Sequence, residues 1–370
     1  MNPRIKKILV LSNNFGGLYS FRKEVFQRFR DLGWEVYISS PVKDMEEKAE
    51  WFKNIGCHVI NTRFDRQGMN PIADFKLMLY YRQLIRQVKA DVVLSYTIKP
   101  NLYGGLAAAL CNVPQIANVT GLGAAVEYPG VLQKLIILLY RVCMRKTNLV
   151  FFQNDANRQF CVKHSMVKGW TRLIPGSGVN LSYHVLKTYP AASAPVRFIF
   201  ISRIRREKGI EEYLATAETI RREYPNTEFH VLGDCEGEYE ERLRRMTNEG
   251  IVVYHGFQSD VRPFIEQASC LIHPSFYPEG MSNVLLEACA AGRPVITTGR
   301  PGCGEIVDDG ETGYIVCQQN ADDVIAKVRH FLSLSYEERK AMGAAARKKV
   351  EQEFDRDIVV KAYEEEILKL

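Results

Sequence analysis

Alternating strand and helix signals, run through twice, most constrain the fold of this chain. In the first half, apolar runs such as Lys7–Ser12 and Asp91–Tyr96 have the length of buried strands, and the amphipathic stretch Asn70–Val88 lies between them. Short apolar runs that alternate with helical patterns are typical of parallel sheets covered by helices on both faces. The sequence therefore predicts an α/β fold with doubly wound, Rossmann-like sheets.

The alternation weakens once and then begins again, which predicts two domains. A polar stretch containing Pro190 and Pro195 interrupts it. We expect an N-terminal domain over residues 1–180, a linker over 181–195 and a C-terminal domain over 196–356. Two such domains are expected to face a central cleft that holds the ligand. The last helical stretch, 357–370, is a candidate for completing the N-terminal domain.

Composition and charge narrow the classes of function. The chain has 370 residues and nine cysteines without any C-x-x-C spacing, which indicates reduced core thiols in a cytoplasmic protein and no metal cluster. No stretch approaches the roughly 20 apolar residues that span a bilayer. Residues 1–186 contain 25 Lys and Arg against 12 Asp and Glu, a net charge of +13. This basic half indicates an anionic partner, either a membrane surface or nucleic acid, or simply a solvated basic face.

The stretch from Tyr277 to Val295 carries the strongest signal for chemistry. Glu279 and Glu287 are separated by seven residues, and Ser282 between them is a suitable N-cap for a short helix. The first N–H groups of a helix attract an anion, and Gly280 allows the backbone to come close to it. Two carboxylates beside a phosphate site suit a sugar nucleotide. An isolated pair at this spacing is more often two solvated carboxylates.

Two further loops contain groups that suit a diphosphate. Arg203 and Lys208 bracket a turn after a predicted strand, where two cations can neutralise a departing diphosphate. Gly16 and Gly17 follow the first strand, and their backbone N–H groups are placed to approach phosphate or the donor sugar.

These motifs together resemble retaining glycosyltransferases of family 4, which have the two-domain GT-B fold. The resemblance rests on the E-x7-E stretch, on Gly299–Val307 and on Asp309–Val316. It implies transfer of a sugar from a nucleoside diphosphate sugar, most often a UDP-sugar, with retention and with no metal or other cofactor. It implies catalytic roles for Glu279, Arg203 and Lys208. The donor ligands expected from it are Gly16, Gly17, Arg203, Lys208, Asp234, Phe257, Glu279, Gly280, Met281, Ser282 and Glu287.

The acceptor side is expected in the first half of the chain. The loop Asn118–Gly123 resembles one found in capsule- and lipopolysaccharide-type members, so Asn118, Thr120 and Glu127 are candidate acceptor contacts. The resemblance favours an acceptor glycan on a polyprenyl diphosphate, with a soluble acceptor as the alternative. In the segment 130–148, Lys134, Arg141 and Arg145 fall on one face of an apolar helix. This pattern predicts either a peripheral contact with the inner face of the cell membrane or a core helix whose basic edge is exposed to solvent.

Two other classes of protein fit less well. Gly121-Leu-Gly123 opens a G-x-G pattern, but no third glycine closes it, which disfavours a dinucleotide-dependent oxidoreductase. No basic-aromatic motif supports a nucleic-acid binder.

Overall fold

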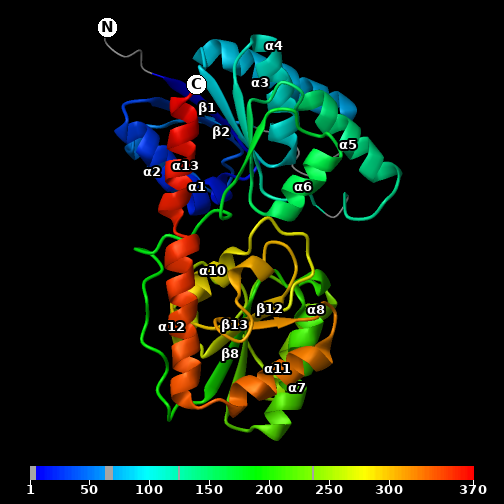
Figure 1. Cartoon of the computed structure of the whole chain (residues 1–370), viewed down its shortest axis with the longest axis vertical. Coiled ribbons are helices and arrows are strands. Elements are labelled where there is room, and N and C mark those ends of the chain that lie inside the picture. The colour runs from blue at the N-terminus through cyan, green and yellow to red at the C-terminus, as the bar shows by residue number, and fades with distance from the viewer. Residues whose placement is uncertain (1–5, 63–69, 124–125, 236) are drawn as a thin grey trace. The chain divides into compact units, whose positions relative to one another are not determined.

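The computed structural model describes residues 6–62, 70–123, 126–235 and 237–370. The chain forms two compact units (Figure 1). Unit 1 comprises Met1–Ser177 together with Asp357–Leu370, and unit 2 comprises Gly178–Arg356. Residues 181–195, for which the sequence predicts a linker, therefore belong to unit 2.

Unit 1 contains a seven-stranded parallel sheet in the order β3-β2-β1-β4-β5-β6-β7. The central strands β1, β4 and β5 are almost entirely buried, as expected for a sheet with helices on both faces. The order changes direction between β1 and β4, which is where ligands bind in open α/β sheets. The strands are β1 (Lys7–Leu11), β2 (Glu35–Ser40), β3 (His58–Asn61), β4 (Val92–Tyr96), β5 (Gln115–Val119), β6 (Leu149–Phe152) and β7 (Trp170–Leu173).

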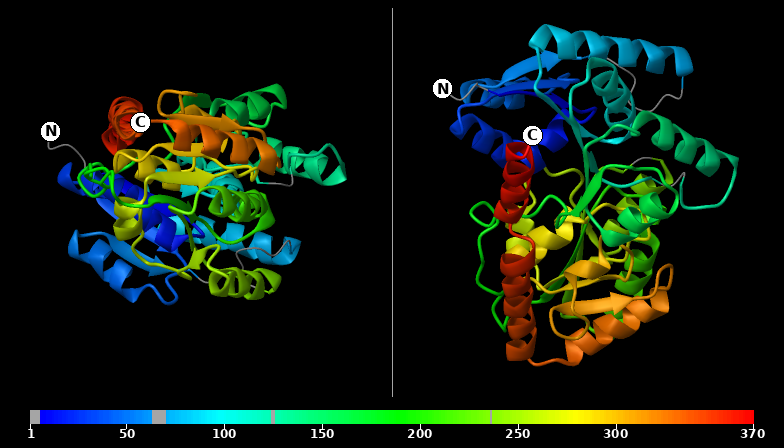
Figure 2. Two further views of the ribbon diagram at one scale, coloured as in Figure 1. Left: turned by 90° about the horizontal axis from the view of Figure 1, so that it is seen from below. Right: turned by 45° about the horizontal axis from the view of Figure 1, so that its top comes forward.

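The helices of unit 1 include one from the end of the chain. Helix α13 packs its Val359, Tyr363 and Ile367 into the same hydrophobic core as Ile8 and Phe151. Figure 2 shows this last helix in red. The helical elements are α1 (Phe15–Asp31), α2 (Glu46–Asn54), α3 (Pro71–Val88), the π-helix η1 (Pro100–Gly104), α4 (Gly105–Cys111), α5 (Val131–Cys143), α6 (Asp155–Lys163) and α13 (Arg356–Leu368).

Unit 2 contains a six-stranded parallel sheet in the order β10-β9-β8-β11-β12-β13. Its order changes direction between β8 and β11, so the loops after these two strands lie at the expected ligand position. The strands are β8 (Val196–Ile201), β9 (Thr227–Leu232), β10 (Val253–Tyr254), β11 (Cys270–His273), β12 (Val295–Thr298) and β13 (Gly313–Val316).

One buried arginine fixes the start of unit 2. The guanidinium of Arg293 is fully buried and donates to the carbonyls of Lys187, Thr188 and Glu266. These bonds hold the stretch before β8 against the rest of the unit. The helical elements of unit 2 are η3 (Arg206–Lys208), α7 (Ile210–Glu223), α8 (Glu238–Asn248), α9 (Arg262–Gln267), α10 (Asn283–Ala290), η4 (Gly304–Ile306), α11 (Ala321–Ser333) and α12 (Tyr336–Glu353).

Candidate functional site

A buried ion pair joins the loops that follow β8 and β11. Lys208 ends η3 and is only 7% exposed, and its Nζ contacts Oε1 of Glu279. The same Nζ lies 4.4 Å from the centre of the Tyr277 ring. Because β8 and β11 are hydrogen-bonded neighbours, residues 71 positions apart in sequence meet at one edge of the sheet. The pair thus lies at the position where the fold predicts a ligand.

The electrostatics of this pair keep Glu279 charged. Burial favours the protonated carboxyl, but nearby His273 and the Lys208 ammonium outweigh it and lower the pKa of Glu279 to about 2. The carboxylate is therefore ionised across the physiological range. In that state it accepts hydrogen bonds, as recognition of sugar hydroxyls requires.

The helix predicted after Glu279 is present as α10. Ser282 is its N-cap residue, although its side chain makes no capping bond. The Ser282 N–H donates to the Gly302 carbonyl at 2.7 Å, which fixes the backbone before the helix. Gly302 has a φ of +89°, and a Cβ there would lie 2.8 Å from the Gly280 oxygen. This close backbone packing buries Gly280, Met281 and Ser282, which lead into the N-terminus of α10. The first N–H groups of a helix favour an anion.

Arg203 and Asp234 line one pocket of about 600 Å³ in unit 2. The two strand ends that carry them are tied together, because the Ile204 N–H donates to the Asp234 carbonyl at 2.8 Å. Arg203 is exposed, whereas Lys208 points into the buried pair with Glu279. The structure therefore places the two predicted cations in different surroundings. Arg205 and Arg206 are also exposed, and they line the same pocket as Arg203.

Glu287 lies in different surroundings from Glu279. It lines a cavity of about 20 Å³, room for roughly one water, with Tyr183, His184 and Arg262. Burial raises the pKa of Glu287 to about 7, although nearby Arg356 opposes the shift. The E-x7-E spacing thus places one carboxylate in an ion pair and the other in a small cavity beside residues 183–187.

Several groups around these two glutamates escaped the sequence analysis. Arg262 stacks on the Tyr183 ring at 3.8 Å and bonds Asp260 at 2.7 and 2.8 Å, while His184 lines the Glu287 cavity. His273 lies 3.8 Å from Glu279. The Arg262–Tyr183 stacking and the cavity shared by His184 and Glu287 join segments far apart in the sequence, so no local pattern signals them. Of the remaining predicted donor ligands, Phe257 follows β10 and has an exposed ring, 66% accessible.

The predicted residues of unit 1 occupy varied positions. Gly16 and Gly17 lie in the first turn of α1, where the Gly17 N–H donates to the Asn14 side chain at 3.0 Å. Asn118 is buried, and its amide donates to the Tyr363 hydroxyl of α13 at 2.7 Å. Its side chain is thus used to hold the last helix. Thr120 and Glu127, in contrast, are half-buried.

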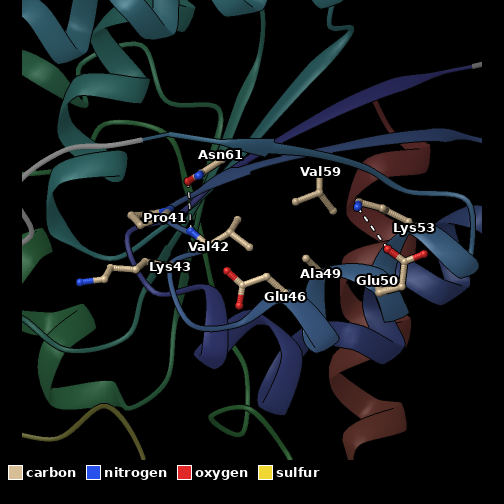
Figure 3. Close-up of a pocket in the computed structure, with 9 residues that line it drawn as sticks. All are labelled: Pro41, Val42, Lys43, Glu46, Ala49, Glu50, Lys53, Val59 and Asn61. Carbon is tan, nitrogen blue, oxygen red and sulfur yellow. Dashed lines mark hydrogen bonds and ion pairs between the residues drawn. The ribbon is translucent and has the colours of Figure 1, made fainter.

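A pocket of about 840 Å³ in unit 1 lies between α2 and the edge strand β3 (Figure 3). Its lining residues are Pro41, Val42, Lys43, Glu46, Ala49, Glu50, Lys53, Val59 and Asn61. None of the residues predicted from the sequence lines it.

Helix α5 presents an apolar row to the surface. Val131, Leu135, Leu138 and Val142 are 86%, 48%, 54% and 56% exposed. Their spacing places them on one face of the helix, opposite the buried Ile137, Tyr140 and Cys143. Lys134 and Arg141 lie along one edge of this row, and Arg145 lies just beyond the end of the helix.

In the parts of the chain that the structure describes, no three His, Cys, Asp or Glu side chains group together in a way that suits a metal ion. Within the same residues, no helix has the length and apolarity needed to cross a bilayer.

Two family models match this chain. Residues 187–349 match the family described as "Glycosyl transferases group 1", and residues 7–154 match "Glycosyl transferase 4-like". Among characterised relatives, an N,N'-diacetylbacillosaminyl-diphospho-undecaprenol alpha-1,3-N-acetylgalactosaminyltransferase of Campylobacter jejuni is 24% identical and covers 96% of this chain and 97% of its own. A capsular polysaccharide biosynthesis glycosyltransferase, CapM of Staphylococcus aureus, is 25% identical over 89% of this chain and 88% of its own.

Solved structures show the same fold. A glycosyltransferase of Rickettsia africae superposes with a TM-score of 0.80 at 20% identity, covering 99% of both chains. Anabaena HepE, solved with UDP and glucose, superposes with a TM-score of 0.79 at 17% identity, covering 99% of this chain and 100% of its own. The predicted GT-B fold is thereby confirmed.

Proposed function

Because this chain belongs to the group 1, GT4-like glycosyltransferases, which transfer sugars from nucleotide sugars, we propose that its donor is a UDP-sugar and that it retains the anomeric configuration. We further propose that the acceptor is a hydroxyl of a glycan carried on a polyprenyl diphosphate. The observation that carries the donor assignment is the buried Lys208–Glu279 pair beside the N-terminus of α10. HepE, whose fold is similar, has been solved with UDP-glucose.

Each group in unit 2 has a proposed task at the donor. Glu279 accepts hydrogen bonds from the sugar hydroxyls, and the N-terminus of α10 receives a phosphate. Lys208 and Arg203 neutralise the charge that develops on the leaving diphosphate. Glu287 binds the ribose. Lys208 and Arg203 thus stabilise the leaving diphosphate, and the proposed mechanism needs no metal ion for this.

Donor hydrolysis over UDP-, GDP- and ADP-sugars tests the donor assignment. Lys208→Met should reduce turnover by about 100-fold or more, since it removes one preorganised charge from the leaving group. Lys349→Met is a matched control in the same unit, because Lys349 is also largely buried and pairs with Asp308 at 2.9 Å. Equal turnover in Lys208→Met and wild type, or hydrolysis of GDP-sugars alone, would reject the assignment.

The lipid-linked acceptor is supported by one relative and one surface. The C. jejuni relative is named for an undecaprenol-diphosphate-linked substrate. Helix α5 combines an exposed apolar row with a basic edge and contains no acidic residue. An apolar row sinks into the boundary of headgroups and acyl chains, and cations beside it meet anionic lipids. We propose that α5 holds the enzyme on the inner face of the cell membrane, where such an acceptor is carried.

Helix α3 adds a second exposed row to the same unit. Ile72, Phe75 and Leu79 are 69%, 59% and 42% exposed. The hydroxyl of Tyr103 in η1 donates to Asp74 of α3 at 2.8 Å, and η1 continues into α4, which packs on α5. The one carboxylate of α3 is thus bound by Tyr103 and Lys99, so it does not oppose an anionic surface.

Vesicle flotation separates this proposal from the alternative of a soluble acceptor. The full chain should float with phosphatidylcholine vesicles that contain about one-third phosphatidylglycerol, because anionic lipid attracts the basic edge of α5. The double change Leu135→Glu and Leu138→Glu should abolish flotation. Val162→Glu is the matched control, because Val162 is equally exposed but lies on α6. Wild-type protein that stays with the soluble fraction would favour the soluble acceptor.

A further inference from the structure

His273, the last residue of β11, is buried beneath the Lys208–Glu279 pair. It is 1% exposed, and its ring packs 6.0 Å from that of Phe200. Among the described residues, neither ring nitrogen has a hydrogen-bond partner. Nε2 lies 3.8 Å from Glu279 Oε1, the same oxygen that contacts Lys208. The imidazole is therefore aimed at the carboxylate but lies just beyond hydrogen-bond length.

A buried polar group without a partner is costly, so its position calls for an explanation. The carbonyl of His273 is held by the Thr297 hydroxyl at 2.7 Å, which fixes the backbone at the end of β11. The imidazole ring of His273 is therefore held in a defined position beside Glu279. In the proposed function, Lys208 binds the donor diphosphate, and this requires it to loosen its contact with Glu279. That movement would leave a buried carboxylate without its cation.

We propose that His273 is a positioning residue, which takes over Glu279 Oε1 when Lys208 turns to the donor diphosphate. The inference rests on the proposed function of the Lys208–Glu279 pair. A small shift of the His273 ring or of the Glu279 side chain brings the ring N–H within hydrogen-bond distance of Oε1. Glu279 then stays oriented toward the sugar while Lys208 works on the leaving group.

The exchange also predicts proton uptake. Burial lowers the pKa of His273 and the Lys208 charge lowers it further, whereas Glu279 raises it. Other titratable groups near the pair are Tyr277, whose ring centre lies 4.4 Å from Lys208 Nζ, and the Cys303 thiol, which burial keeps protonated by raising its pKa. Departure of Lys208 removes a nearby positive charge, so the pKa of His273 rises on donor binding. The complex then binds more protons than the free enzyme, and UDP affinity increases as the pH falls toward 6.

Calorimetry of UDP binding in buffers of different ionisation enthalpy measures this proton uptake. Wild type should take up a fraction of a proton near pH 6.5, and His273→Leu and His273→Gln should take up none. Turnover of His273→Leu should fall by roughly 10- to 100-fold with little change in KM, because the sugar ligand is misplaced. His273→Gln keeps an N–H donor, so it should retain most of the turnover.

His230→Leu is the control for loss of a buried histidine. His230 lies on β9 of the same sheet, is 9% exposed and pairs with His255 at 2.9 Å. The His230→Leu variant should take up as many protons on UDP binding as wild type does. Unaltered proton uptake in His273→Gln would overturn the inference, even if His273→Leu fails to fold. No binding of UDP by wild type would reject the proposed donor and the inference together, whereas UDP binding without proton uptake rejects the inference alone.

Discussion

Replacing Lys208 by Met should destabilise unit 2 in a pH-dependent way. The pKa of Glu279 is about 2 in the folded chain against an ordinary value of 4.5. At about 1.4 kcal/mol per pKa unit, the groups around Glu279 stabilise its ionised form by about 3 kcal/mol. Breaking a buried pair by removing one partner costs a similar amount, about 3–5 kcal/mol. Because His273 supplies part of this shift, we expect Lys208→Met to lower the free energy of unfolding by up to about 3 kcal/mol at pH 7.

The dependence on pH has a definite sign. Because the folded-state pKa of Glu279 lies below its unfolded value, its stabilising contribution is complete above pH 4.5 and is lost as the pH falls toward 2. The difference between Lys208→Met and wild type should therefore be largest at neutral pH and shrink below pH 4. The double variant Lys208→Met with Glu279→Gln should lose less than the single one, because no unpaired charge stays buried.

The tryptophans of this chain permit a clean assay. Trp34, Trp51 and Trp170 all lie in unit 1, so fluorescence follows that unit alone. Far-UV circular dichroism follows both units, and the part of a urea transition absent from fluorescence belongs to unit 2. Lys349→Met should cost under about 1 kcal/mol, since its partner Asp308 is half-exposed. A loss in Lys208→Met that is the same at pH 7 and pH 3 would refute the electrostatic reasoning.

Three further outcomes follow from the structure. Glu287→Gln should stabilise unit 2 by up to about 3 kcal/mol above pH 7 and have no effect below pH 4, because the raised pKa of Glu287 makes its ionisation costly. Urea unfolding at both pH values measures this difference. Tighter UDP binding by the variant would contradict the proposed role of Glu287 at the ribose. Tyr363→Phe should destabilise unit 1 by about 1 kcal/mol in the fluorescence transition, because it removes the partner of Asn118. Gly233→Ala should prevent unit 2 from folding, as judged by loss of its circular dichroism transition, since a Cβ there would lie 1.7 Å from the Ser202 oxygen.

Strong local signals allowed most long elements to be predicted. Helix α12 (Tyr336–Glu353) begins at a capping box between Ser335 and Glu338, a signal that can be read from the sequence alone. Helix α1 begins at Phe15, so Gly16 and Gly17, which the sequence analysis places after the first strand as phosphate-approaching glycines, lie in its first turn. The Asn14 side chain caps it there, and Gly16 and Gly17 do not break the first turn.

Short elements with weak patterns were not predicted. Helices α2, α6 and α9 have nine, nine and six residues, too few for a clear period, and they are helical because they pack on the sheets. The edge strand β7 lacks a buried apolar run, and its Trp170 is 84% exposed. Tertiary pairing with β6 decides its conformation.

The candidate site was predictable in kind but not in its contacts. The motif around Glu279 predicts an anion site at a helix N-terminus, and α10 starts where expected. Sequence spacing did not reveal that Lys208 pairs with Glu279, nor that Glu287 shares a small cavity with His184. Both arrangements depend on the order of strands in the sheet and on the path of residues 178–195, which lie far away in the sequence.

Unit 1 is built from two separate segments of the chain, and this has a consequence for synthesis of the protein. Unit 2 is one continuous segment, whereas unit 1 needs Val359, Tyr363 and Ile367 from the very end of the chain to fill its core. During translation the first-made domain is thus the last to be finished, and unit 2 can fold while unit 1 still lacks its final helix. A stop codon shortly before residue 357 would leave unit 2 whole and strip unit 1 of part of its interior.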